Sequence, residues 1–157
     1  MRKLKVLIGG EDSIFCHAKK ALVEYWGFDV IAASDGKQAC AALLANHVDL
    51  CILDWDLPRM RGLEACRWIR SVDLKSQPYV VLLAEKNRPE QPQAAYLAGA
   101  NDFISKPFNL QDFHFLVSVF AKKVAQKDVV SEQLTRIDPI ELYRRDRVTI
   151  GKLYPRL

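Results

Sequence analysis

Two hydrophobic patterns alternate along the first 126 residues of the chain. Short runs that are apolar at every position lie at 6–8, 30–33, 50–53, 79–83 and 103–104. They have the length of strands and are rich in β-branched residues. A run without polar alternation is typical of a parallel strand covered by helices on both faces. The sequence therefore predicts five strands in one parallel sheet.

The longer segments between these runs have the apolar spacing of helices. The clearest stripe follows the last run and repeats at intervals of three and four residues: Phe113, Leu116, Val117, Phe120, Ala121 and Val124. Asp35 and Asn109 stand where helix N-caps are expected. Five strands, each followed by a helix, predict an α/β doubly wound parallel sheet, (βα)5, and we assign residues 1–126 to this domain.

Residues 127–157 do not continue the alternation. Apolar residues between 129 and 137 can prolong the last helix toward Pro139, and the remainder is too short for a second domain. For residues 127–157 we therefore expect a C-terminal helical extension or tail, or the start of a truncated linker.

Composition narrows the class of protein. Half of the residues are hydrophobic and 27% are charged, as in globular proteins. The net charge is only +4, without the dense basic stripe of a nucleic-acid binder, so no direct nucleic-acid partner is expected. No apolar run approaches the roughly 18 residues of a membrane span, and the run at 6–8 is too short for the apolar part of a signal peptide, so we do not expect secretion. We expect a cytoplasmic protein without membrane contact, whose four cysteines are reduced.

Charged side chains follow three of the predicted strands. Glu11 and Asp12 come after the first strand, Asp54 and Asp56 after the third, and Lys106 after the fifth. Because ligands bind at the carboxyl ends of strands in an open parallel sheet, we expect these side chains to converge on one crevice. Two carboxylates about 4 Å apart repel by roughly 4 kcal/mol at an effective dielectric constant near 20, and a hard cation such as Mg²⁺ removes that repulsion. An aspartate beside a metal ion and a lysine is suited to phosphoryl transfer.

Each of these residues also has a simpler explanation on its own. Asp54 can cap the turn before Pro58, Asp12 can cap the first helix, and Lys106 can be a solvated surface residue. Their joint placement at the ends of separate strands is what favours a common site.

Two longer motifs resemble a known family. Residues 54–62 read DWDLPRMRG and residues 98–108 read AGANDFISKPF, and both are similar to the receiver domain of bacterial two-component response regulators. The resemblance implies a flavodoxin-like fold with strand order 2-1-3-4-5. It implies that Asp54 accepts a phosphoryl group from a histidine kinase or phosphotransfer protein and that Lys106 binds the phosphoryl oxygens. The backbone carbonyl of Asp56 would complete a Mg²⁺ shell.

The same resemblance implies a conformational switch. The switch positions are Leu83, Ala84 and the aromatic Phe103, and the function is to switch a downstream protein partner rather than to act as an enzyme. In this family the fourth helix, fifth strand and fifth helix form the interaction face, so a homodimer through that face is possible.

Two positions depart from the family pattern. Receiver domains normally carry two adjacent acids after the first strand, but ungapped counting places Gly10 and Glu11 there. We therefore expect Glu11 to bind the metal directly and Asp12 to substitute in part. Leu83 stands where Thr or Ser is usual, so the hydroxyl that bonds the phosphoryl group is lost. We expect the leucine to shield the site or to restrict the rotation of Phe103.

These departures leave two alternatives open. The first is a pseudo-receiver, an interaction module of the same fold whose state does not depend on phosphorylation. It rests on Gly10 and Leu83. The second is a small metal-dependent phosphatase of the haloacid dehalogenase type, because Asp54 and Asp56 have the spacing of its two aspartates. Pro58 and Gly62 fit a receiver better than such a phosphatase.

Overall fold

A computed structural model describes residues 3–10, 13–85, 88–106 and 108–129. Contacts divide the chain into two compact units, Met1–Pro107 and Phe108–Leu157. Glu11, Asp12 and the expected extension beyond residue 129 lie outside the described residues, so the predicted boundary at residue 126 stays a prediction.

Strands and helices alternate along the described chain, as the hydrophobic pattern predicts. The strands are β1 Lys5–Gly9, β2 Asp29–Ala33, β3 Leu50–Asp54, β4 Tyr79–Glu85 and β5 Asp102–Lys106. The helices are α1 Ser13–Glu24, α2 Gly36–Ala45, α3 Gly62–Ser71, α4 Gln91–Leu97 and α5 Leu110–Val129. Within the described residues, none of these helices is long and apolar enough to cross a membrane.

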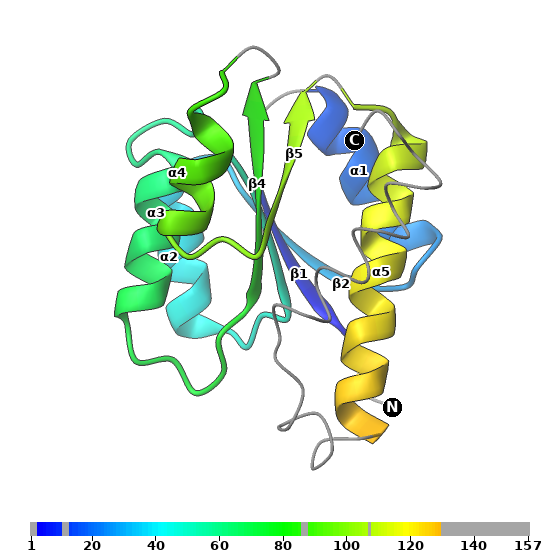
Figure 1. Cartoon of the computed structure of the whole chain (residues 1–157). Helices are drawn as coiled ribbons and strands as arrows, with labels where there is room; N and C mark the ends of the chain where they lie inside the picture. The colour runs from blue at the N-terminus through cyan, green and yellow to red at the C-terminus, as the bar shows by residue number, and fades with distance from the viewer. Residues whose placement is uncertain (1–2, 11–12, 86–87, 107, 130–157) are drawn as a thin grey trace. The chain divides into compact units, whose positions relative to one another are not determined.

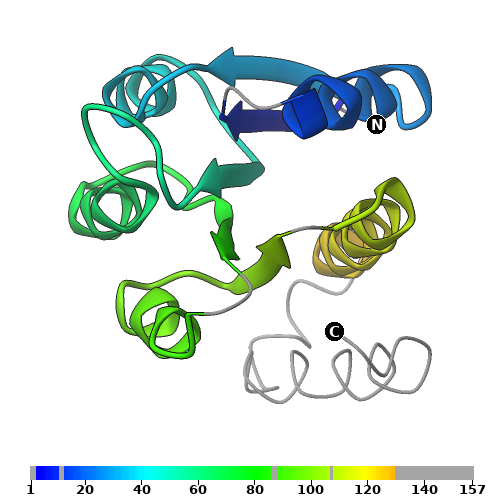
Figure 2. The same cartoon turned by 90° about the horizontal axis from the view of Figure 1, so that it is seen from above.

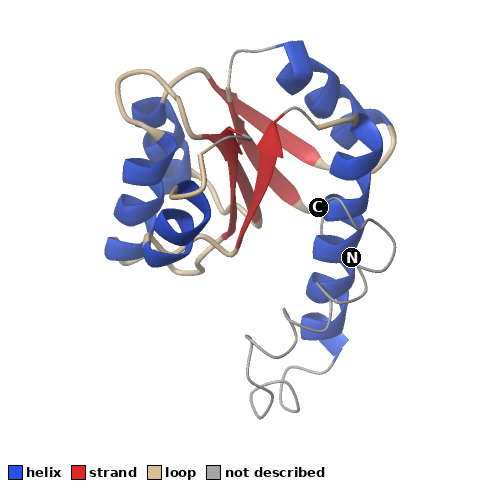
Figure 3. Cartoon of the chain, turned by 45° about the horizontal axis from the view of Figure 1, so that its top comes forward, coloured by secondary structure: helices blue, strands red, loops and turns tan. Residues whose placement is uncertain are grey.

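The five strands form one parallel sheet in the order β2-β1-β3-β4-β5 (Figure 1). This confirms the predicted fold class and strand order. Helices α2, α3 and α4 lie on one side of this sheet and α1 on the other (Figure 2). The strands form the inner layer between them (Figure 3). Because both faces are covered, a strand such as β3 is buried at all five positions and has no polar alternation.

Alternate residues of each strand belong to opposite faces of the sheet. Leu53, Leu82 and Ala84 join one core cluster with residues of α2, α3 and α4, such as Cys66. Strand residues between them, such as Leu83, lie on the opposite face of the sheet. All residues of this core are buried, and they fix the register in which the carboxyl ends of the strands meet.

Two predicted N-caps are confirmed. The backbone N–H of Gln38 donates to the carboxylate of Asp35 at 2.8 Å, which satisfies a free donor at the start of α2. Before α5, the side-chain oxygen of Asn109 accepts a hydrogen bond from the backbone of Asp112 at 2.7 Å, while Asp112 accepts one in return at 3.4 Å. This reciprocal pair is a capping box built with Asp as the acid.

Candidate functional site

A pocket of about 280 Å³ opens at the carboxyl edge of the sheet. It is lined by residues that follow or end four different strands: Gly10, Asp54, Asp56, Leu57, Pro58, Glu85 and Lys106. Asp54 is the last residue of β3 and Lys106 the last of β5, although 52 positions separate them in the sequence. The topology therefore brings together charges that the sequence holds far apart.

Asp54 and Lys106 form a largely buried ion pair. The Lys106 ammonium donates to both carboxylate oxygens of Asp54, at 2.9 Å and 3.1 Å. Only 7% of Asp54 is exposed, and its Oδ1 atom also accepts the backbone N–H of Asp56 at 3.2 Å. Charge-assisted hydrogen bonds of this length stabilise a carboxylate that burial would otherwise disfavour.

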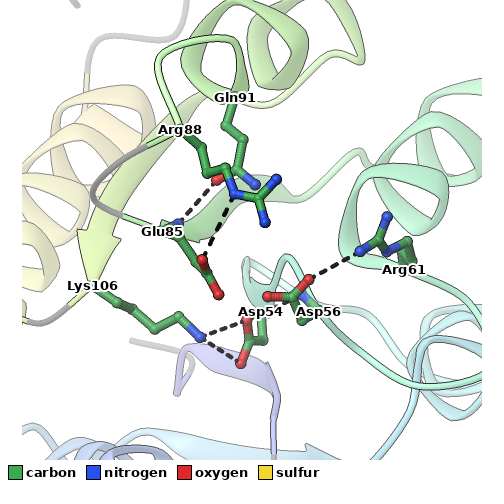
Figure 4. A network of polar contacts seen from close by, with 7 residues as sticks. All are labelled: Asp54, Asp56, Arg61, Glu85, Arg88, Gln91 and Lys106. Atoms are coloured by element: carbon green, nitrogen blue, oxygen red, sulfur yellow. Dashed lines mark hydrogen bonds and ion pairs between the residues drawn. The ribbon is translucent and has the colours of Figure 1, made fainter.

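Two more carboxylates stand at the rim, each beside an arginine (Figure 4). Asp56 accepts a hydrogen bond from Arg61 at 3.2 Å, and Glu85 lies 3.9 Å from Arg88. The carboxylate of Glu85 points toward the Asp54–Lys106 pair rather than away from it (Figure 4). The pocket thus holds three carboxylates, and their cationic partners are the last residue of β5, the N-cap residue of α3 and a residue of the loop after β4.

Close backbone contacts hold the loop after Asp54 in place. The N–H of Trp55 donates to the carbonyl of Leu83, and the N–H of Gly62 donates to the carbonyl of Trp55. A Cβ atom on Gly62 would overlap the carbonyl of Asp54, so only glycine allows α3 to begin this close to the end of β3. The motif at 54–62 therefore has a structural reason for its final glycine.

The register of β4 decides how Leu83 relates to the site. Leu83 is paired with Asp54 in β3 and with Ile104 in β5, whereas Phe103 is paired with Leu82. Paired residues lie on the same face, so Leu83 lies beside Asp54 and opposite to Phe103. Leu83 is 1% exposed, which agrees with a shielding role. The register places Leu83 and Phe103 on different faces, so it gives no support to a restriction of Phe103 by the leucine, and that expectation stays a prediction.

Phe103 instead packs on the side of the sheet that α2, α3 and α4 cover. Its ring lies against the ring of Tyr96 from α4, with centroids 5.7 Å apart in an edge-to-face arrangement. The neighbouring switch position, Ala84, is buried in the same core cluster. An aromatic contact therefore joins β5 to α4 on the side of the sheet away from Leu83.

The donors of the pocket are those that Mg²⁺ prefers. Asp54 and Asp56 supply carboxylate and carbonyl oxygens, and the described residues that line the pocket include neither a histidine nor a cysteine. Within the described residues, no group of three acidic, histidine or cysteine side chains is close enough together to hold a metal ion. Glu11 and Asp12, the other expected ligands, are outside the described residues, while Gly10 is a pocket residue without a side chain to contribute.

Sequence reasoning assigned no role to Glu85, Arg88 or Gln91. The backbone N–H of Glu85 donates to the side-chain oxygen of Gln91 at 2.9 Å, and Gln91 is only 6% exposed at the start of α4. Glu85 could have been found, because it ends the fourth strand at the same edge as Asp54 and Lys106. The link to Gln91 follows from how the loop after β4 returns to the sheet, and no local pattern indicates it.

Comparison with known proteins agrees with this geometry. Residues 6–118 match the family model of the response regulator receiver domain. The response regulator MprA of Mycolicibacterium vanbaalenii is 28% identical over 152 residues, which are 92% of this chain and 65% of that protein. The chain thus spans somewhat less than two thirds of the length of this relative.

Two solved structures have the same fold. The receiver domain of Saccharomyces cerevisiae Ssk1, crystallised with the histidine phosphotransfer protein Ypd1, superposes with a TM-score of 0.66 at 23% identity, covering 75% of this chain and 88% of that one. The receiver domain of the Pseudomonas aeruginosa sensor histidine kinase PA1611, which has magnesium in its active-site cleft, gives 0.65 at 21% identity, covering 77% and 97%. The fold, the two motifs and the family match together establish that the chain belongs to the response regulator receiver domain family of two-component systems.

Proposed function

We propose that this receiver domain accepts a phosphoryl group on Asp54 from a histidine kinase or phosphotransfer protein, and that the modified domain switches a downstream protein. The observation that carries the proposal is the ion pair of Asp54 and Lys106 in a pocket at the carboxyl edge of the sheet. The receiver seen with a phosphotransfer protein supports this class of partner.

The chemistry needs one covalent exchange at the Asp54 carboxylate. One carboxylate oxygen attacks the phosphorus of the donor, a new O–P bond forms as the P–N bond to the donor histidine breaks, and the histidine nitrogen keeps the electron pair. Lys106 already donates to both carboxylate oxygens. Its ammonium is therefore placed to neutralise charge on the transferred group.

Mg²⁺ is the cofactor that this oxygen-donor pocket suits. Asp54 and the backbone carbonyl of Asp56 are the described groups proposed to hold it, with Glu11 as a direct ligand and Asp12 substituting in part. A bound Mg²⁺ would neutralise the repulsion among the pocket carboxylates and charge on the phosphoryl oxygens. The magnesium in the PA1611 receiver supports this assignment.

The pseudo-receiver is the second candidate, and one observation favours it. Leu83 lies buried beside Asp54 and offers no hydroxyl, so the usual hydrogen bond from this position to a phosphoryl group is missing. A hydrogen bond to a charged group contributes about 1.5–3 kcal/mol, which corresponds to about tenfold or more in a switching equilibrium. If partner binding is the same for the wild type, Asp54→Glu and Asp54→Ala, the pseudo-receiver is favoured.

The phosphoacceptor is tested by intact-mass measurement. The wild-type chain, incubated with phosphoramidate or acetyl phosphate and Mg²⁺, should gain about 80 Da, the mass of one phosphoryl group. Asp54→Asn should gain nothing, and a chelator should slow the reaction of the wild type. A wild-type chain that stays unmodified, under conditions that modify an ordinary receiver, would contradict the proposal.

The haloacid dehalogenase alternative makes a different prediction. Such a phosphatase would turn over a generic phosphate ester in the presence of Mg²⁺, whereas a receiver stops at one phosphoryl group on Asp54. Multiple turnovers that are lost in Asp54→Asn would favour the phosphatase.

A further inference from the structure

The loss of the hydroxyl at position 83 raises the question of what else can contact a phosphoryl group on Asp54. The described cations of the pocket and its rim are Lys106, Arg61 and Arg88, and each of them contacts a carboxylate. Lys106 is held by two short contacts to Asp54, and Arg61 makes a hydrogen bond to Asp56. Arg88 has the loosest of these pairings, a single Nε contact of 3.9 Å to Glu85.

Glu85 is one of the two further carboxylates in the pocket that a phosphoryl group on Asp54 would disturb. It lines the same pocket as Asp54, and its carboxylate points toward the Asp54–Lys106 pair (Figure 4). A phosphoryl group would carry about two negative charges into this space. This negative charge would repel the carboxylate of Glu85. It would also attract the guanidinium of Arg88 toward the phosphoryl oxygens.

The guanidinium of Arg88 can move toward a phosphoryl group on Asp54 and can bind its oxygens. Its side chain is 59% exposed, so the guanidinium can move without breaking a packed core. A guanidinium matches phosphate oxygens with two parallel N–H donors, which it does not achieve in its contact with Glu85. Exchanging Glu85 for a phosphoryl group would therefore improve the hydrogen bonding of Arg88.

The backbone next to Arg88 leads directly to α4. The carbonyl of Arg88 accepts a hydrogen bond from the N–H of Gln91, the first residue of α4, at 3.1 Å. The side chain of Gln91 in turn accepts the N–H of Glu85 at 2.9 Å. Glu85, Arg88 and the buried Gln91 thus form one connected unit between the pocket and the helix that carries Tyr96.

We propose that Arg88 is a phosphoryl-binding residue that exchanges Glu85 for the phosphoryl group of Asp54, and so couples the pocket to α4 without a hydroxyl at position 83. The proposal rests on Asp54 as the phosphoacceptor. Arg88 acts on the phosphoryl group directly, while Glu85 and Gln91 are positioning residues.

The test uses beryllofluoride, a stable analogue of the phosphoryl group, with Mg²⁺ and the full chain. Its affinity can be followed by tryptophan fluorescence, because Trp55 is next to Asp54, and the response of α4 by backbone amide NMR. Arg88→Gln should weaken the analogue at least about tenfold and abolish the amide shifts of α4, because it removes a charged hydrogen-bond donor. Arg88→Lys should restore part of the affinity, and Glu85→Gln should not weaken binding.

The matched control is Arg67→Gln, an exposed arginine of α3 outside the pocket, which should behave as the wild type. If Arg88→Gln binds the analogue as tightly as the wild type and α4 shifts equally, the inference is wrong while Asp54 remains the phosphoacceptor. If the wild type neither binds the analogue nor gains a phosphoryl group, both the proposed function and the inference are wrong.

Discussion

Lys106 forms two contacts with Asp54, and both side chains are largely buried. The exposed fraction is 21% for the side chain of Lys106 and 9% for that of Asp54. Removing the ammonium leaves a carboxylate that is both poorly hydrated and close to Asp56 and Glu85. Lys106→Ala should therefore lower the free energy of unfolding by about 1–3 kcal/mol at neutral pH and slow the modification of Asp54. Chemical denaturation and the rate of phosphoryl gain measure the two effects.

Lys75→Ala is the matched control for this prediction. Lys75 is exposed in the loop between α3 and β4, so its removal should change the stability by less than about 0.5 kcal/mol. Equal stability of the Lys106 and Lys75 variants would show that the buried ion pair contributes nothing to the fold.

The cysteines give a second prediction at the scale of single residues. Burial raises the pKa of the Cys40, Cys51 and Cys66 thiols, whereas Cys16 is exposed on α1. In the folded chain iodoacetamide should therefore modify Cys16 alone, and in denaturant it should modify all four. Rapid labelling of Cys51 in the folded chain would contradict the buried position.

Because of these buried thiols, the free energy of unfolding should fall at high pH. The folded chain keeps them protonated, while in the unfolded chain they ionise above about pH 8.5. The unfolded state then binds fewer protons, so the free energy of unfolding should fall as the pH rises beyond that value. Denaturation at about pH 7 and about pH 9.5 tests this, and Cys51→Ala should show a shallower fall than the wild type.

At the scale of elements, the start of α3 is fixed by Gly62. A side chain there meets the backbone carbonyl of Asp54, which cannot move without shifting the end of β3. Gly62→Ala should lower the free energy of unfolding by about 1–3 kcal/mol and slow phosphoryl gain, because the phosphoacceptor itself is displaced. Thermal unfolding and intact mass measure the two effects.

Gly27 is the control position for Gly62. Its φ of +69° favours glycine, but no atom lies within 4 Å of where a Cβ would stand. Gly27→Asn should be well tolerated, because asparagine adopts this conformation more readily than most residues. A Gly62→Ala variant as stable as Gly27→Asn would contradict the close approach of α3 to β3.

The strands were predictable because β3 and β4 are buried on both faces and so lack polar residues, apart from their final acids. The end of β4 was predicted at Leu83, two residues early, because Glu85 is polar although it still pairs with Lys106. Local pattern also could not show that Leu83 and Phe103 face opposite sides, since that depends on which residues are paired across strands.

For the molecule as a whole, we propose a homodimer that uses α4 and β5 as one output of the switch. Leu97 ends α4 with 79% of its surface exposed, which makes it the most exposed large hydrophobic residue of the described chain. Beryllofluoride with Mg²⁺ should increase the dimer fraction of the wild type in sedimentation velocity, and Leu97→Glu should prevent this. Leu44→Glu, at an exposed leucine of α2, is the control and should dimerise normally.

A dimer fraction that does not respond to the phosphoryl analogue would contradict that proposal. An increase in the dimer fraction that Leu97→Glu and Leu44→Glu reduce to the same extent would also contradict it. The surface around Leu97 would then have no specific role in the dimer. Neither result would affect the assignment of Asp54, which rests on its ion pair with Lys106 in the pocket.

The sequence predicts which residues lie at the ends of the strands, but not how exposed side chains of the loops pair. Asp54 and Lys106 could be placed at one edge of the sheet, because parallel strands end together. The arginine partners of Asp56 and Glu85 could not, because exposed side chains pair according to loop geometry rather than periodicity. The roles of Glu11 and Asp12 remain predictions, since both residues lie outside the described chain.

The most direct test locates the phosphoryl group on the chain. After reaction with phosphoramidate and Mg²⁺, reduction with borohydride converts an acyl phosphate on aspartate to homoserine, which peptide mass spectrometry can assign to a position. We predict homoserine at position 54 and at no other aspartate, Asp56 included. Homoserine elsewhere, or its absence from a chain that has gained a phosphoryl group, would contradict Asp54 as the phosphoacceptor.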